Sequence, residues 1–62
     1  MKTINVKTVK AATAVTARKY LTVEITEQAR IMAIIPVDIK GTKVYKEDGV
    51  WYATATVVGK EV

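Results

Sequence analysis

The residues of this chain that can do chemistry are basic side chains and tyrosines, and they gather in its N-terminal third. Residues 1–20 carry five basic side chains and no acidic one, a local charge of +5, whereas residues 21–62 carry five basic and six acidic side chains. A one-sided positive field attracts polyanions and acidic partner surfaces.

Exposed aromatic rings on a basic β-surface are typical of proteins whose polyanionic ligand is a nucleic acid. Such rings stack on nucleobases, while neighbouring lysines displace counterions from the phosphate backbone. We therefore expect nucleic acid as the favoured ligand, bound through the basic N-terminal third and exposed tyrosines. The candidate nucleic-acid-binding residues are Lys7, Lys10, Arg18, Lys19, Tyr20 and Tyr52.

Catalysis is a poor fit to the side chains that are present. The chain has no Cys, no His and no Ser, so it lacks a thiol nucleophile, the commonest general base and the usual zinc ligands. Its six acidic residues show no calcium-loop spacing, and its three glycines are isolated, so no phosphate-cradling loop is present. We expect a binding protein that is not an enzyme and uses no metal and no cofactor.

A second class of partner remains open. A chain this short, with few devices that protect strand edges, also suits a protein–protein interaction module, a small inhibitor or an adaptor, acting through a strand edge or by oligomerising with copies of itself. The longest apolar run, residues 31–37, is too short to span a membrane, and the N-terminus lacks the apolar stretch of a signal peptide. We expect a cytoplasmic location and no membrane partner.

The composition predicts that strands position these residues. The 62 residues include 10 Val, 9 Thr and 6 Ile but a single Leu. β-branched side chains lose rotamer freedom in helices and pack well on pleated surfaces, whereas Leu is a good helix former. The dominance of a few residue types is also typical of an engineered sequence, although Lys19 among inward positions and Pro36 within a strand are irregularities that idealised designs avoid.

Alternation of apolar and polar residues predicts about five short strands, over residues 2–10, 20–26, 30–40, 42–46 and 50–58. In the second of them, Leu21, Val23 and Ile25 point to one face. A turn is expected at Gly41. Asp48-Gly49 between two runs of β-formers predicts a hairpin, whose second strand turns Trp51, Ala53, Ala55 and Val57 to one face.

The predicted fold is a single small β domain over residues 1–62, with a frayed C-terminus from about residue 59. A single open sheet of this size would expose one face and two edges, so we expect an all-β, five-stranded antiparallel barrel of SH3-like or OB-like architecture. The alternative is an α+β domain with one short helix in residues 10–20 or 26–35, where Thr26 is a potential N-cap and Pro36 would end the helix.

Overall fold

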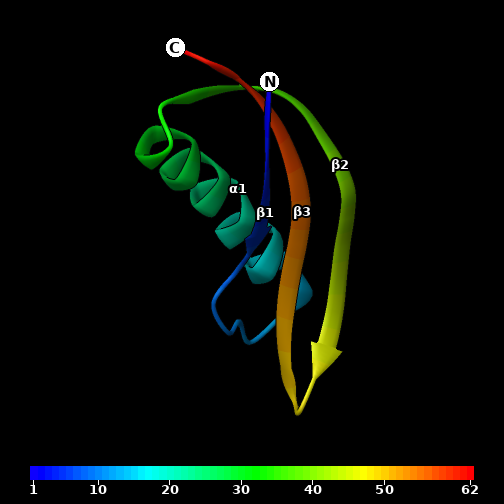
Figure 1. Ribbon diagram of the computed structural model, residues 1–62. Coiled ribbons are helices and arrows are strands. Elements are labelled where there is room, and N and C mark those ends of the chain that lie inside the picture. Colours follow the sequence, from blue (N-terminus) through cyan, green and yellow to red (C-terminus); the bar gives the residue numbers. More distant parts are fainter.

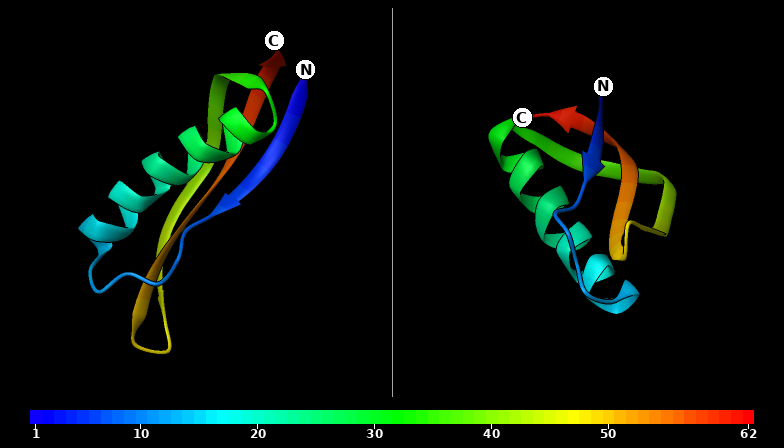
Figure 2. Two further views of the ribbon diagram at one scale, coloured as in Figure 1. Left: turned by 90° about the vertical axis from the view of Figure 1, so that its left-hand side faces the viewer. Right: turned by 90° about the horizontal axis from the view of Figure 1, so that it is seen from below.

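The computed structural model describes all 62 residues and shows an α+β architecture. The elements follow in the order β1 (Lys2–Lys7), α1 (Ala14–Ile31), β2 (Ile34–Glu47) and β3 (Val50–Glu61). The three strands form one antiparallel sheet in the order β1-β3-β2. Helix α1 lies along one face of this sheet and leaves the other face open (Figure 1, Figure 2).

The prediction of a closed five-stranded barrel is therefore wrong, and the error lies between residues 14 and 31. The strand expected over residues 20–26 lies inside α1, an 18-residue helix. The α+β alternative placed a short helix in residues 10–20 or 26–35, whereas α1 covers parts of both ranges and everything between them. None of the elements is a helix both long enough and apolar enough to cross a membrane.

A buried stripe at every fourth residue explains why this segment is helical. Ala17, Leu21, Ile25 and Ala29 are its buried residues, a spacing that brings side chains to one face of a helix. Val23, which alternation placed beside Leu21 and Ile25, is 56% exposed. Burial of the stripe against the sheet outweighs the weak helix propensity of the β-branched residues, which amounts to a few tenths of a kcal/mol each.

The helix begins at Thr13, whose extended backbone and side chain form the N-cap. The Thr13 hydroxyl oxygen accepts a hydrogen bond from the backbone N–H of Thr16, with an N···O distance of 3.1 Å. Such a cap satisfies one of the N–H groups that a helix start leaves unpaired. Strand alternation predicts that Lys19 points inward, but Lys19 is exposed on the helix surface.

The predicted hairpin is confirmed. Asp48 and Gly49 have φ angles of 51° and 81°, and Glu47 pairs directly with Val50. Two consecutive positive φ values are characteristic of a tight turn whose twist matches that of the strands, and the Asp-Gly pair adopts them readily. The turn lies at one end of the molecule, while the two chain ends lie together at the other (Figure 1).

Strand β2 differs from its prediction at Gly41. This glycine, with φ of 61°, does not separate two strands; it lies in a register shift between Lys40 and Lys43 inside one 14-residue strand. The irregularity expected at Pro36 has a structural counterpart: proline cannot donate to a strand ladder, β2 is an edge strand, and a second register shift lies between Pro36 and Asp38.

The core lies between α1 and the central strand β3. Ala53, Ala55 and Val57 are buried and pack with the helix stripe, and Trp51 packs against them at the border of the core, so the predicted shared face is found. Beyond them β3 continues to Glu61, past the frayed end expected at about residue 59, because Gly59 is buried and pairs with Lys2.

The segment between β1 and α1 closes one end of this core. Thr8 is buried, and its hydroxyl accepts a hydrogen bond from Ala53 N–H (2.9 Å) while its own N–H donates to the Ala53 carbonyl (3.0 Å). Ala11 exchanges two backbone hydrogen bonds with Trp51. These contacts extend the β1–β3 pairing and set the place where α1 starts.

Candidate nucleic-acid interface

No element covers the face of the sheet opposite α1. Alternate β3 residues from Ala53 to Gly59 are buried under the helix, so the intervening side chains point to the open face. Directly paired residues of neighbouring strands share a face. The register therefore places three sets on the open face: Thr3, Asn5 and Lys7 from β1; Val50, Tyr52, Thr54, Thr56, Val58 and Lys60 from β3; and Ile35, Asp38, Lys40, Lys43, Tyr45 and Glu47 from β2.

The charge of this open face is predominantly positive. All three strands contribute to it, with Lys7 from β1, Lys60 from β3, and Lys40 and Lys43 from β2. Its acidic side chains are Asp38, which lies 3.8 Å from the Lys40 ammonium, and Glu47 beside the hairpin turn. The other polar groups are neutral, and the Thr56 hydroxyl donates to the Asn5 side-chain oxygen at 3.0 Å. This surface suits an anionic ligand with hydrogen-bonding groups.

A stack of three side chains lies near the turn end of the hairpin, where Lys7 of β1 meets the two strands. Tyr45 and Tyr52 pair directly across β2 and β3, with ring centroids 5.7 Å apart and planes inclined by 28°. The Lys7 ammonium lies 4.6 Å from the centroid of the Tyr52 ring. Both tyrosines are half-buried, so their rings are held in place while part of each remains accessible. A fixed aromatic platform beside an ammonium group that forms no salt bridge is an arrangement that nucleobases and phosphates can use.

A shallow hollow of about 380 Å³ lies next to this stack. It extends over β3 from β1 to β2 at the height of the register shift around Gly41. Lys7 of β1 and Lys43 of β2 lie on its two sides, so two ammonium groups flank one concave area. Its lining includes Asn5, Lys7, Gly41, Lys43, Thr54 and Thr56.

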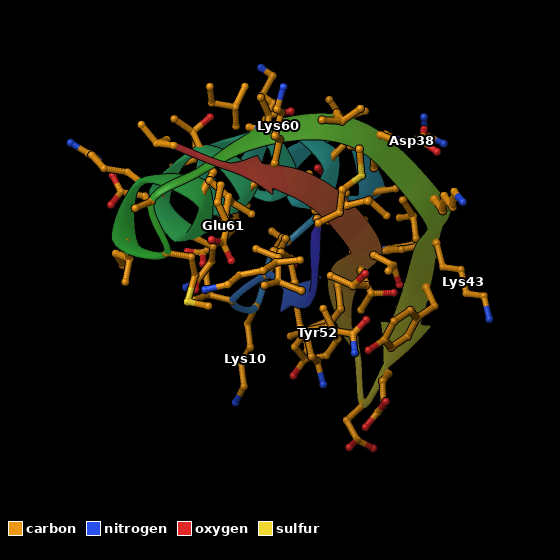
Figure 3. All side chains as sticks on the ribbon, turned by 45° about the horizontal axis from the view of Figure 1, so that its top comes forward. Lys10, Asp38, Lys43, Tyr52, Lys60 and Glu61 are labelled. Atoms are coloured by element: carbon orange, nitrogen blue, oxygen red, sulfur yellow. The ribbon has the colours of Figure 1, made fainter.

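The structure brings together only part of the predicted binding set. Lys7 and Tyr52 are neighbours on the open face. Arg18, Lys19 and Tyr20 belong to α1, on the opposite side of the sheet, where all three are exposed. Lys10 lies in the segment before α1 and projects from a different side of the molecule than Lys43 (Figure 3). The N-terminal charge therefore does not form one surface.

Sequence reasoning missed Lys40, Lys43, Lys60 and Tyr45. The signal for Tyr45 was present, because a two-residue Asp48-Gly49 turn pairs residue 47 with 50 and hence Tyr45 with Tyr52. Lys43 follows from the same register, since it lies on the same side of β2 as Tyr45. Lys60 required knowing that β3 continues to Glu61.

Comparison of the chain with protein-family models, curated proteins and solved structures finds no match.

Proposed function

We propose that this protein binds single-stranded nucleic acid on the open face of its sheet, without catalysing a reaction. The observation that carries the proposal is the stack of Lys7, Tyr52 and Tyr45 on a face lined by lysines from all three strands. Proteins that read single strands lay unstacked bases on aromatic side chains of a sheet and follow the phosphates with basic groups.

Binding requires Lys7 to exchange one contact for another. In the free protein its ammonium covers one side of the Tyr52 ring, a contact worth about 0.5–1 kcal/mol at an exposed site. A base stacked on a tyrosine contributes about 1–3 kcal/mol. The exchange is therefore favourable, and the displaced ammonium is free to pair with the phosphate next to the stacked base.

Single strands fit this face better than duplexes. In a duplex the bases stack on one another, so their faces cannot reach Tyr52 or Tyr45 without unstacking, which costs a few kcal/mol per step. The binding surface is also the face of a sheet and offers no projecting helix, because α1 lies behind it. A projecting helix is one of the elements that a major groove accepts.

The test is fluorescence anisotropy of labelled oligonucleotides about 20 nucleotides long. Single-stranded DNA, RNA and duplex DNA are titrated with the protein at about 50 mM salt. Tyr52→Leu keeps an apolar side chain opposite Tyr45 but removes the aromatic platform, and the loss of about 1–3 kcal/mol predicts 5- to 150-fold weaker binding. Lys43→Glu is expected to weaken it as well, through the reversed charge.

Matched controls lie on the helix side. Tyr20→Leu and Lys19→Glu make the same chemical changes on α1 and are expected to change the affinity less than twofold, apart from the small effect of net charge. Far-UV circular dichroism verifies that each variant is folded. Absence of binding by the wild-type protein at low salt, or an equal loss in the helix variants, would refute the open-face proposal.

A further inference from the structure

The outer edge of β2 carries apolar side chains that the single chain leaves uncovered. β2 pairs with β3 on one side only, and no element lies beside its outer edge (Figure 1). Ile35, Val37 and Ile39 are each about half exposed. Ile35 belongs to the open face and Ile39, paired with Val57, to the helix face, while Val37 lies in the register shift between them. The apolar surface thus follows the edge and extends onto both faces, which marks an interaction site.

The molecule is elongated, 38 × 18 × 15 Å, and exposes more surface than a compact monomer of its mass. A compact 6.8 kDa monomer exposes about 3,950 Å², and this chain exposes 4288 Å². Its radius of gyration is 11.8 Å, against about 10.6 Å for a compact domain of this length. The excess of roughly 330 Å² is about two-fifths of what each partner buries in a standard interface.

The charges on β2 are complementary to a second β2 in antiparallel orientation. Asp38 and Lys40 flank Ile39 and both lie on the open face. When two such strands run antiparallel about a two-fold axis at Ile39, residue 38 of each copy lies opposite residue 40 of the other. Each aspartate then faces a lysine, and the two Ile39 side chains face each other on the helix side. Opposite-charge and apolar pairs in directly opposed positions both stabilise a sheet.

Interruptions on either side keep this contact short. Register shifts lie between Pro36 and Asp38 and between Lys40 and Lys43, and such irregularities, like proline, limit strand addition. The opposite edge, β1, is only six residues long and ends in lysines at both sides. Short, charged edge strands resist pairing. The assembly therefore closes after two copies.

We propose that two copies of this chain form a two-fold dimer in which the β2 edges pair antiparallel around Ile39, joining the sheets into one of six strands. The dimer forms without nucleic acid, although it pairs Lys40 of one open face with Asp38 of the second copy and places both open faces on the same side.

The test is the molar mass in solution, measured by sedimentation equilibrium between about 5 µM and 1 mM. The mass is expected to rise from 6.8 kDa to twice that value. Ile39→Lys places two ammonium groups face to face at the axis and should raise the dissociation constant more than tenfold. Val23→Lys makes a comparable change at a half-exposed valine of α1 and should leave the dissociation constant unchanged.

A charge swap tests the register itself. Asp38→Lys replaces both aspartate–lysine pairs of the dimer by lysine–lysine pairs and is expected to weaken the dimer. D38K/K40D reverses both charges and should restore the dimer. A wild-type mass of 6.8 kDa at about 1 mM, a mass above that of two chains, or equal effects of Ile39→Lys and Val23→Lys overturns the proposal. Failure of the double swap to restore dimerisation overturns the Ile39-centred pairing.

Discussion

Gly59 shows how closely two residues can be matched within this small core. A Cβ atom at this position would lie 2.5 Å from Ile34 Cδ1 and 3.0 Å from Ile34 Cβ and Cγ1. Both residues are buried, and Ile34 starts β2 with only Met32 and Ala33 between it and the end of α1. The absence of a side chain at residue 59 is therefore what allows the start of β2 to cover the end of β3.

Substitution of this glycine is expected to destabilise the fold by overpacking. Gly59→Ala should lower the free energy of unfolding by about 1–3 kcal/mol, measured by urea denaturation with Trp51 fluorescence as the probe. Combining it with Ile34→Val removes the atom of the closest contact and should restore part of the loss. If Gly59→Ala is neutral, or if the added Ile34→Val only deepens the loss, the close contact does not determine this packing.

At the scale of elements, α1 is stabilised by its buried stripe and by contact with β3. The stripe is made of two alanines at its ends and Leu21 and Ile25 between them. Small residues at 17 and 29 let the helix approach the sheet, where Ala53 and Ala55 are also small. Strand alternation and helical spacing make opposite predictions for Val23, which alternation groups with Leu21 and the helix leaves exposed.

Two alanine substitutions distinguish a helix from a strand in this segment. Leu21→Ala should cost about 2–5 kcal/mol of unfolding free energy, because it empties a buried site. Val23→Ala should change it by less than about 0.5 kcal/mol, because an exposed valine is replaced by a better helix former. Thermal or urea denaturation followed by circular dichroism measures both. A comparable cost at the two positions would contradict the helix and favour a strand.

At the scale of the whole molecule, the fold redistributes a net charge of +4. The first 20 residues appear in the sequence as one basic block, but β1 and α1 lie on different layers, so Lys7 is separated from Arg18 and Lys19 by the sheet. Conversely, Lys40, Lys43 and Lys60, which are distant from Lys7 in sequence, join it on the open face. The electrostatic potential that a ligand meets is therefore determined by how the fold distributes these lysines over the surface.

The salt dependence of binding reports how many of these lysines contact phosphates. Four contacts predict a slope of log K against log salt concentration of about −2.8 for a single strand, or roughly 50-fold weaker binding between about 50 and 200 mM salt. Lys43→Glu should make the slope shallower by at least about 0.7, measured by anisotropy titrations at several salt concentrations. Lys19→Glu should leave it nearly unchanged. A flat slope for the wild-type protein would exclude phosphate contacts by the open face.

Parts of this structure that depend on local chemistry could be predicted from the sequence. The Asp48-Gly49 turn, the strand that follows it and the common face of Trp51, Ala53, Ala55 and Val57 were predicted correctly, because a turn type and period-two alternation are properties of adjacent residues. The same turn already implied the pairing of Tyr45 with Tyr52. Of the candidate site, Lys7 and Tyr52 are brought together, and Arg18, Lys19 and Tyr20 are placed on the other layer.

What the sequence alone determined is the hairpin, the irregularity at Pro36 and the uneven charge, each of which follows from residue types at short range. Only the tertiary structure decided that residues 14–31 are helical and that the lysines of three strands share a face. The β-branched residues of this segment have a local preference for strands worth a few tenths of a kcal/mol each. Burying Ala17, Leu21 and Ile25 against β3 outweighs that preference, and this burial exists only once the sheet has formed.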